Sequence, residues 1–570
     1  MKNQEVAKFL YEMADLLDIL GVAWKPNAYR RAARTIEMLS EAIEDVYARG
    51  KTAALKDLPG VGDAIASKIE EYLKTGSVKE LRALEKKVPK GVDEMMHVQG
   101  LGPKKAWRLY HELKIHNLQE LEKAAKEHRI SKLEGFGEKS ESEILQSLGL
   151  HSAGQARRLL LTGLDTAREL EKRLARFGTA IAAGSVRRRR ETIGDIDILV
   201  SASKAKPVMD YFTTMPDVQR VLAKGDTKST VILGNGMQAD VRVLDEKLFG
   251  AALQYFTGSK DHNVKVRQIA IKKGYKLSEY GLVSRKTDRI IAAKTEEEVY
   301  RKLGLPYIEP ELREDSGEIE AALKGRLPKL IGYDDLRGDC HMHTTWSDGE
   351  NSTEDMVKAA IARGYDYVAI TDHSKSTVIA NGLDEKRVLK RIAEIDKLQK
   401  KYPQIAILKG SECDILKTGE LDYKPAILKQ LDVVIASVHA SMKMNREDMT
   451  KRYLRAIDSG FVTAIGHPTG RLINSRQPFD FDLERVASAA AKAGVAFEIN
   501  ANPARLDLKD SHIRAASQLG ARFLIDTDSH SADHLRLMEL GIAQARRGWL
   551  EAKDVLNTLP RQKFLKAIQR

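Results

Sequence analysis

Apolar residues recur every three or four positions along the first 150 residues, the spacing that places them on one face of an α-helix. The first stretch of this kind carries Val6, Phe9, Leu10, Met13 and Leu17. Runs of β-branched residues, which favour strands, are few in this part of the chain. The pattern predicts a helical region over residues 1–150.

The pattern changes near residue 179, where short apolar strands alternate with turns and helices. We expect strands at TAIAAGS, DIDILVS, VQRVLA, TVILG and ADVRVL. Residues 250–310 indicate helices with short hairpins. From Glu309 to Arg337 the chain has two separated prolines, acidic runs and little periodicity in its first half, which is typical of a linker.

After Leu336, apolar strands alternate with helices of about ten to fifteen residues. We expect these strands at YVAIT, IAILKG, DVVIAS, VTAIG, VAFEIN and RFLID. This alternation predicts parallel strands with crossover helices, closed or nearly closed as a barrel. The polar motifs of this region follow the strands, at the end where barrel enzymes carry their chemistry.

Composition and charge narrow the class of protein. The chain has 570 residues, long enough for several domains, with 31% charged and 42% hydrophobic residues, as in soluble globular proteins. Its formal net charge of +13 favours a polyanionic partner, although a surface rich in both signs of charge explains it equally well.

Cysteine content and hydropathy indicate where the protein resides. The two cysteines, Cys340 and Cys413, imply no disulfide framework and favour a reducing cytoplasm, and we expect both in the core. The N-terminus has the pattern of an amphipathic helix, not of a signal peptide. No apolar run approaches the ~18 residues that span a bilayer. We therefore expect a soluble, cytoplasmic protein with no membrane association.

A five-residue phrase, or motif, occurs three times in the helical region. It consists of a hydrophobic residue, any residue, glycine, a second hydrophobic residue and a second glycine. Its glycines are Gly60 and Gly62, Gly100 and Gly102, and Gly135 and Gly137. Backbone N–H groups at such a turn, at the start of a helix, approach a phosphate closely. A tight turn between helices explains one copy. Three copies followed by lysines predict helix-hairpin-helix elements that bind nucleic acid without reading its sequence.

The clearest chemistry lies in one predicted strand. Asp195 and Asp197 alternate with Ile196 and Ile198, so the two acids project from one face and the isoleucines from the other. Carboxylates this close repel one another unless a divalent cation lies between them, as two-metal phosphoryl transfer requires. The alternative is a pair of surface acids on a half-buried strand.

Residues around this strand complete a nucleotidyltransferase pattern. Gly184 and Ser185 follow an apolar strand and offer a bare backbone turn and a hydroxyl to a triphosphate, and Arg188 offers charge. A third acid is expected on a neighbouring strand, where Asp240 fits. The alternative for Asp240 is an exposed salt bridge with Arg242.

Histidines concentrate in the predicted barrel. Eight of the 14 histidines lie after residue 340, and six of them fall in short polar phrases at strand ends. His341 and His343 present two imidazoles on one face of a strand, a frequent metal pair. Histidine and carboxylate ligands together suit Zn²⁺, Mn²⁺ or Fe²⁺. A single histidine is usually structural, as we expect for His512 and His534, but six at successive strand ends indicate a metal site.

The N-terminal segments Asn27-Ala28-Tyr29-Arg30 and LPGVGDAIASKIEEYL (58–73) resemble the lyase domain of DNA polymerase beta and its family X relatives. The resemblance places Lys68 at the lysine that forms a Schiff base with deoxyribose 5′-phosphate, and Lys25 and Tyr29 where the family binds the 5′-phosphate. A lysine with a depressed pKa is the usual imine-forming nucleophile. Ala64 stands where the family has another lysine. The alternative for Lys68 is a solvated lysine on a DNA-facing helix.

The segment from Tyr255 to Arg267 is similar to the family X segment that holds the incoming nucleotide. The resemblance implies that Tyr255 and Phe256 pack on the sugar, that Asn263 reaches the base and that Arg267 touches the template strand. It also implies nucleotide binding by Gly184, Ser185, Arg188, Gly194 and Gly258, and DNA binding by Arg242. The alternative for Tyr255 and Phe256 is a place in the core, where aromatic residues at this spacing usually lie. Arg189 replaces a glycine of the vertebrate enzymes.

The C-terminal histidine phrases resemble the polymerase and histidinol phosphatase (PHP) domain. The resemblance implies a metal site in which Glu412 bridges ions and a water is activated against a phosphoester. Carried over by motif, the ligands are His341, His343, Asp348, His373, Glu412, His439, His467, Asp528 and His530. Up to three ions of Zn²⁺, Mn²⁺ or Fe²⁺ are expected there.

The whole chain thus resembles a bacterial or archaeal family X DNA polymerase with a fused PHP domain, a multidomain α+β protein. We expect a lyase-like helical domain (1–85), helix-hairpin-helix fingers (86–150), a nucleotidyltransferase palm (151–250), a thumb (251–312), a linker (313–334) and a barrel-like PHP domain (335–570).

The resemblance implies a template-directed DNA polymerase that fills short gaps in base excision repair, with Mg²⁺ or Mn²⁺ held by Asp195, Asp197 and Asp240. The PHP domain would act as a 3′–5′ exonuclease, 3′-phosphoesterase or abasic-site endonuclease. The expected partners are gapped or primer-template DNA and dNTPs, and the expected state is a monomer. Two alternatives stay open: an untemplated nucleotidyltransferase, and a DNA-binding phosphoesterase with an inactive polymerase core.

Overall fold

The computed structural model describes residues 3–20, 22, 25–37, 43–85, 87–89, 92, 95, 101, 103–133, 135–137, 140–141, 144 and 157–569. Gly100 and Gly102, predicted to bind DNA, lie outside the described residues. The chain divides into two compact units, Met1–Arg157 with Phe177–Thr179 and Leu199–Leu305, and Arg158–Arg176 with Ala180–Ile198 and Pro306–Arg570. Within the described ranges, no helix is long and apolar enough to cross a membrane.

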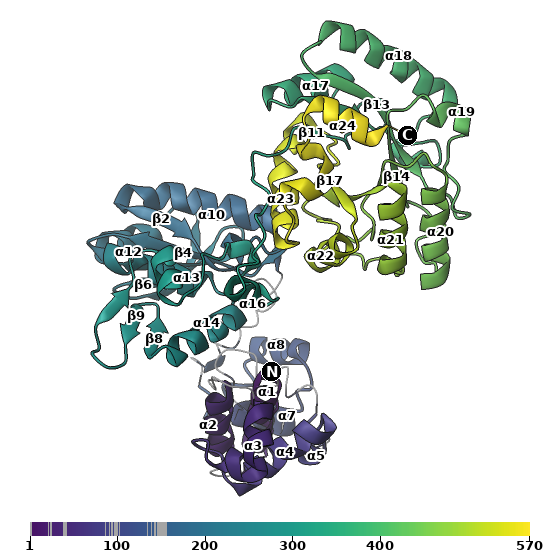
Figure 1. The fold of residues 1–570 in the computed structure, drawn as a ribbon. Helices are drawn as coiled ribbons and strands as arrows, with labels where there is room; N and C mark the ends of the chain where they lie inside the picture. Colours follow the sequence, from purple (N-terminus) through teal and green to yellow (C-terminus); the bar gives the residue numbers. More distant parts are fainter. Residues whose placement is uncertain are drawn as a thin grey trace. The chain divides into compact units, whose positions relative to one another are not determined.

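The N-terminal region is helical, as its periodicity predicts (Figure 1). Its helices are α1 (Asn3–Ile19), α2 (Lys25–Glu37), α3 (Ile43–Lys56), α4 (Asp63–Thr75), α5 (Lys79–Glu85), α7 (Pro103–Leu113) and α8 (Leu118–Lys126). Phe9, Leu10 and Met13, on the predicted apolar face of α1, are buried in one core. Leu109 and Leu121, on α7 and α8, belong to a second core.

The first and third glycine phrases adopt the same turn. Gly60 has a φ of 83° and Gly135 a φ of 81°, a left-handed conformation that favours glycine. In each turn the residue after this glycine donates its backbone N–H to the carbonyl oxygen three residues earlier: Val61 N to Leu58 O at 3.0 Å, and Phe136 N to Leu133 O at 2.9 Å. The repeated phrase therefore encodes a repeated backbone geometry.

Residues 157–305 mix strands and helices. A five-stranded sheet has the order β2-β4-β7-β6-β5, and a small antiparallel sheet has the order β10-β9-β8. The strands are β1 (Arg158–Leu159), β2 (Thr179–Ala182), β3 (Thr192–Ile193), β4 (Asp195–Ser201), β5 (Val218–Lys224), β6 (Lys228–Leu233), β7 (Gln238–Leu244), β8 (Tyr275–Ser278), β9 (Gly281–Ser284) and β10 (Ile290–Ala292). The helices are α10 (Leu160–Leu174), α11 (Gly184–Arg187), α12 (Ala205–Thr213), α13 (Phe249–Thr257), α14 (Lys260–Lys272) and α15 (Glu296–Lys302). All five strands expected before residue 245 are confirmed.

The segment for which the sequence indicates a linker is ordered and packed. It contains α16 (Glu318–Leu323), preceded by a short 3-10 turn at Pro310–Leu312. The side chains of Arg313 and Glu318 are fully buried. Glu318 accepts hydrogen bonds from the backbone N–H groups of Asp315 and Ser316. The low periodicity of this segment thus reflects local polar contacts, which hydrophobic patterning does not register.

The C-terminal strands form a barrel (Figure 1). Seven parallel strands pair in chain order: β11 (Gly338–Asp339), β12 (Tyr367–Ile370), β13 (Ala406–Asp414), β14 (Val433–Ser437), β15 (Ala464–Ile465), β16 (Ala496–Asn500) and β17 (Arg522–Asp526). A parallel bridge between Met342 and Ser529 joins the extension of β11 to that of β17. The predicted barrel is therefore confirmed, and this bridge closes it beyond the regular strands.

Helices alternate with the barrel strands and lie outside them (Figure 1). They are α17 (Thr353–Ala362), α18 (Glu385–Lys401), α19 (Pro425–Leu428), α20 (Arg446–Asp458), α21 (Leu483–Ala493), α22 (Asp510–Gln518), α23 (Met538–Arg547) and α24 (Arg561–Ile568). Cys340 and Cys413 are buried in the apolar core, as predicted.

Candidate metal centre and nucleotidyltransferase residues

The barrel brings the predicted metal ligands together at one end. Parallel strands present their C-terminal ends at the same edge of the sheet, so residues that follow them converge. His341 and His343 follow β11, His373 follows β12, Glu412 lies in β13, His439 follows β14, His467 follows β15, and Asp528 and His530 follow β17. Asp348 lies in the loop between β11 and α17.

Glu412 lies at the centre of this cluster and is almost fully buried. Both of its carboxylate oxygens face imidazole nitrogens from other strands. Oε2 lies near His373 Nδ1 (2.9 Å), His341 Nε2 (3.3 Å) and His343 Nε2 (3.5 Å), and Oε1 near His467 Nε2 (2.8 Å) and His439 Nε2 (3.2 Å). This position is the one that a bridging ligand requires.

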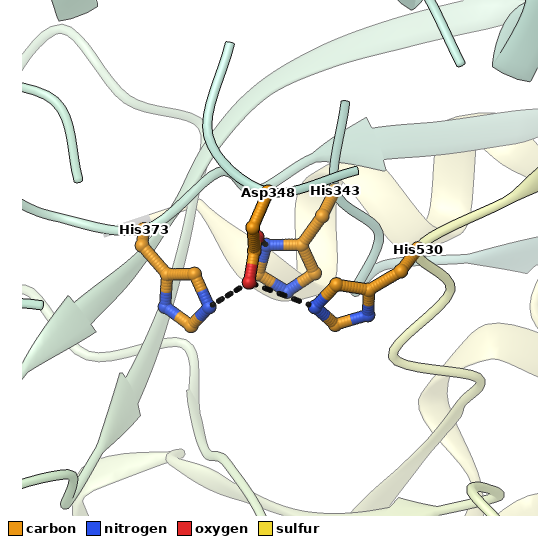
Figure 2. Close-up of side chains that lie close together, drawn as sticks. All are labelled: His343, Asp348, His373 and His530. Carbon is orange, nitrogen blue, oxygen red and sulfur yellow. Dashed lines mark ion pairs between the residues drawn. The ribbon is translucent and has the colours of Figure 1, made fainter. Parts of the chain in front are cut away.

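Two aspartates occupy the other sides of the cluster. Figure 2 shows Asp348 between the imidazoles of His373 and His530, whose Nε2 atoms lie 3.6 Å and 3.4 Å from Asp348 Oδ2. Asp528 Oδ1 lies 3.3 Å from His343 Nε2. Glu412, Asp348 and Asp528 thus each lie beside imidazole nitrogens of the cluster.

The residues fit divalent cations. Ligand atoms lie within 4.8 Å of one another in three overlapping groups: His343, Asp348, His373 and His530; His341, His343, Glu412 and Asp528; and His373, Glu412 and His439. Among the described residues, His341 Nε2 and both ring nitrogens of His343 are buried without a hydrogen bond. Buried polar atoms without partners are rare and costly, and a bound cation satisfies nitrogens that converge in this way.

Electrostatics keep the carboxylates ionised. Burial by itself would raise the pKa of Glu412, but His439, His373 and His341 outweigh it and hold that pKa well below its ordinary range. Burial likewise opposes a charged His373, yet Glu412 and Asp348 raise its pKa to about 10. Ionised carboxylates are the form that binds cations, and a cation replaces the proton on the imidazole.

Two acidic residues that were not predicted from the sequence orient the histidine ligands. Asp414 Oδ1 lies 2.9 Å from His439 Nδ1. Glu498 Oε1 lies 2.5 Å from His341 Nδ1, and its other oxygen accepts the backbone N–H of His467. Such partners fix the ring orientation of a metal-bound histidine. The sequence could have indicated Asp414, because it lies two residues after Glu412 and therefore on the same face of the strand.

The acids of β4 alternate with core residues, as predicted. Ile196 and Ile198 are fully buried, whereas Asp195 is exposed and Asp197 half-buried. Gly184 begins α11 with a φ of 58°, and a Cβ added there would lie 2.7 Å from Asp197 Oδ2. A side chain at this position would therefore press on the Asp197 carboxylate.

Asp240 is not the exposed salt-bridge partner of Arg242. It lies on β7, is only 6% exposed, and pairs with Lys228 at 3.1 Å. Thr230 donates a hydrogen bond to it. Arg242 instead stacks over the ring of Phe256, at 4.5 Å from its centroid.

The segment from Tyr255 to Arg267 forms a tight local unit. Asn263 Nδ2 donates to the backbone oxygen of Tyr255 (2.7 Å), and Arg267 Nε donates to the backbone oxygen of Asn263 (3.3 Å). Tyr255 and Phe256 meet edge to face at the end of α13. Gly258, with a φ of 68°, separates α13 from α14. These predicted nucleotide and DNA ligands are thus neighbours in space, because hydrogen bonds link the two helices.

Arg188, predicted to offer its charge to a triphosphate, is held in an ion pair in this structure. Its Nε atom pairs with Glu314 Oε1 at 3.0 Å, and the side chain is mostly buried. Arg190 and Arg547 share this carboxylate of the segment that precedes the barrel, so Glu314 faces three guanidinium groups. Gly194 and Ser185, by contrast, are only half-buried.

Lys68, the predicted lyase lysine, lies beside Tyr29, and its pKa is raised. Its Nζ atom pairs with Glu80 at 2.8 Å and lies 5.9 Å from the centroid of the Tyr29 ring. Burial lowers the pKa of Lys68, but hydrogen bonds with Glu80 and Tyr29 outweigh burial. An amine of raised pKa is a weaker nucleophile near neutral pH. Lys25 is exposed at the first turn of α2.

Four known family models match parts of the chain. A helix-hairpin-helix domain matches residues 1–78, a SAM-like helix-hairpin-helix tandem 92–149, the DNA polymerase beta thumb 252–314 and the PHP domain 339–502. The chain is 38% identical over 563 residues to the DNA polymerase/3'-5' exonuclease PolX of Bacillus subtilis (strain 168), across 98% of this chain and 97% of that protein. The chain belongs to the family X DNA polymerases that carry a C-terminal PHP domain.

More distant relatives each match a part of this family X chain. DNA polymerase lambda of Rattus norvegicus is 24% identical over 340 residues, which cover 55% of this chain and 56% of that protein. The probable phosphatase Shewmr4_2619 of Shewanella sp. (strain MR-4) is 33% identical over 207 residues, or 34% of this chain and 76% of that protein. The predicted fold class, with helix-hairpin-helix, polymerase beta-like and PHP parts, is thereby confirmed.

Proposed function

We propose that this chain is a template-directed DNA polymerase that fills short gaps during base excision repair and trims DNA 3′ ends with its PHP domain. The observation that carries the proposal is the fit of Gly184 against Asp197 on a strand that also presents Asp195, in a chain similar over its full length to a DNA polymerase/3'-5' exonuclease.

The polymerase reaction joins the primer 3′-hydroxyl to the α-phosphorus of a dNTP and releases pyrophosphate. Two Mg²⁺ or Mn²⁺ ions would lower the pKa of the hydroxyl and neutralise the leaving pyrophosphate. Asp195, Asp197 and Asp240 would hold them, with Asp240 on β7, next to β4 in the order of its sheet. Gly184 and Ser185 would receive the triphosphate at the start of α11.

Further residues of the polymerase half would orient nucleotide and DNA. Tyr255 and Phe256 would pack against the incoming sugar. Asn263, whose amide donates to the backbone oxygen of Tyr255 and accepts from Gln254, would reach the base edge. Gly258 and Gly194 would let backbone approach the nucleotide, and Arg242 and Arg267 would contact DNA.

The PHP site would hydrolyse a phosphoester at a DNA 3′ end. Up to three ions of Zn²⁺, Mn²⁺ or Fe²⁺, held by the nine ligands, would supply an activated water and a charge clamp on the phosphate. Glu412 would hold two of these ions in register, while Asp414 and Glu498 keep the rings of His439 and His341 oriented. Exonuclease and 3′-phosphatase action would place a phosphoester of the 3′ end in this site, and abasic-site cleavage would place an internal phosphodiester there.

The remaining assignments follow from the same reasoning. Gly60 and Gly62 would grip DNA backbone phosphate, as would Gly100 and Gly102. Lys68, with Tyr29 and Lys25, would be the lyase group for deoxyribose 5′-phosphate, acting after its ion pair with Glu80 opens. The protein would act as a cytoplasmic monomer.

One substrate tests the proposal: a gapped duplex with a 5′-phosphate, assayed with each of Mg²⁺ and Mn²⁺. Extension that needs the template strand excludes an untemplated nucleotidyltransferase. Extension that survives Asp195→Ala would show that the polymerase site is misassigned. A protein that trims but never extends would be a DNA-binding phosphoesterase with an inactive polymerase core.

A further inference from the structure

Ion pairs with the barrel, and with the segment that precedes it, hold the residues between the glycine-serine turn and Asp195 in place. We call residues 184–194 the Gly-Ser loop. Its ion pairs reach the segment before the barrel and the barrel itself: Arg188 to Glu314 (3.0 Å), Arg189 to Glu539 (3.4 Å), Arg190 to Glu314 (3.6 Å) and Glu191 to Arg471 (2.9 Å). Four consecutive residues therefore contact a part of the chain that is more than 100 residues away in sequence.

The best-buried contact centres on Arg547, at the end of α23. Its side chain is 3% exposed and pairs with Asp510 (2.5 Å) and Glu314 (3.2 Å). The same guanidinium donates to the backbone oxygen of Arg188 at 2.8 Å. Because Glu314 also pairs with Arg188, one carboxylate and one guanidinium fix both the main chain and the side chain of Arg188.

Arg189 reaches the barrel from a backbone conformation that favours glycine. Its φ is 54°, in the left-handed region that favours glycine and is unfavourable for arginine. The side chain reaches Glu539 of α23 in return. A glycine would adopt this backbone without strain but would have no side chain to reach the barrel.

Glu191 connects the Gly-Ser loop to a second part of the barrel, at Arg471. Arg471 Nη2 pairs with it, while Arg471 Nε donates to the backbone oxygen of Arg505 at 2.8 Å. Arg505 lies 3.6 Å from the metal ligand Asp528. The Gly-Ser loop is thus anchored on two sides of the barrel, by α23 and by the loop that follows β15.

We propose that the barrel positions the Gly-Ser loop for the polymerase reaction, with Arg547, Glu539 and Arg471 as positioning residues for nucleotide binding. The inference rests on the proposed polymerase function and adds a role for the barrel that needs none of its metal chemistry. Gly184 and Ser185 meet the triphosphate only if the rest of the loop is fixed. A shift of ~1 Å in groups that hold a substrate costs about 10²-fold in rate.

The test compares Arg547→Met with the unchanged protein in gap filling and in 3′ trimming. We expect the KM for dNTP to rise at least about tenfold, with trimming within about twofold because Arg547 touches no metal ligand. Arg547→Lys should recover part of the loss. Hydrogen exchange of the amides of residues 184–194 should speed up in Arg547→Met. Arg485→Met, which breaks an exposed barrel pair with Glu447, is the matched control and should change neither.

A second cycle covers the case in which Arg547→Met fails to fold, which loss of trimming would reveal. Arg189→Gly and Glu539→Gln should each raise the KM for dNTP. The double variant should be no worse than Glu539→Gln alone, because both changes remove the Arg189–Glu539 pair, and Glu539→Gln also breaks the pair of Glu539 with Arg168 of α10. Unchanged KM and unchanged exchange in variants that still trim would overturn the inference. Failure of the unchanged protein to extend any primer would refute the proposed function instead, and exchange of the loop would still decide whether the barrel anchors it.

Discussion

Replacing Gly184 by alanine separates catalytic placement from stability. Gly184 has a φ of 58°, and its added Cβ would lie 2.7 Å from Asp197 Oδ2 and 3.7 Å from Asp197 Cγ. The nearest atoms belong to the end of one side chain, so the carboxylate gives way before the backbone does. The change therefore displaces a predicted metal ligand without adding a new functional group.

The two consequences have different sizes. An alanine in the left-handed conformation costs about 1–2 kcal/mol of folding free energy. Restoring ordinary contact distance requires a shift of the carboxylate by several tenths of an ångström or more, and a misplacement approaching ~1 Å costs about 10²-fold in rate. We expect kcat/KM for gap filling to fall about 10- to 100-fold, with 3′ trimming unchanged.

Single-nucleotide gap filling and thermal unfolding measure the two effects side by side. Gly494→Ala is the matched control, since Gly494 has a φ of 68° and nothing within 4 Å of an added Cβ. It should lose similar stability and keep full extension. If Gly184→Ala extends primers as fast as the unchanged protein while both variants lose stability, Asp197 does not act where the structure places it.

Three further outcomes are expected. Glu412→Gln should abolish 3′ trimming and lower bound metal, measured by elemental analysis, yet leave extension; retained trimming would remove Glu412 from the centre. Chelation should lower the unfolding temperature, and Mn²⁺ or Zn²⁺ should restore it, because a ligand of the folded state stabilises that state; no shift would argue against tight binding. Glu80→Gln removes the carboxylate that raises the pKa of Lys68, so borohydride trapping of a deoxyribose 5′-phosphate imine should begin at lower pH. Lys68→Ala should trap none, and an unshifted pH profile would exclude Lys68 as the nucleophile.

Local spacing predicts most of the metal centre. His341 and His343 share a strand face because they are two residues apart, and the other ligands end successive parallel strands, which meet at one edge. The alternation of Asp195 with Ile196 is of the same kind. Such features depend on a few neighbouring residues, so the sequence alone reveals them.

Contacts between segments that are distant in sequence cannot be predicted from local spacing. Glu498 orients His341 from a strand 157 residues away. Glu314 takes the charge of Arg188, and it lies in a segment whose weak periodicity suggests a linker. The left-handed conformation of Arg189 is visible only in the folded backbone. Each of these three features depends on which helices, strands and loops pack together, and hydrophobic spacing does not specify which element packs against which.

The proposed pair of independent sites is tested most directly by one 5′-phosphorylated, single-nucleotide gapped duplex, given in turn to the unchanged protein, Asp195→Ala and Glu412→Gln. The unchanged protein should both extend the primer and trim its 3′ end, Asp195→Ala should only trim, and Glu412→Gln should only extend. Extension by Asp195→Ala, or loss of both activities in either variant with its fold intact, would contradict two separate phosphoryl-transfer sites in this chain.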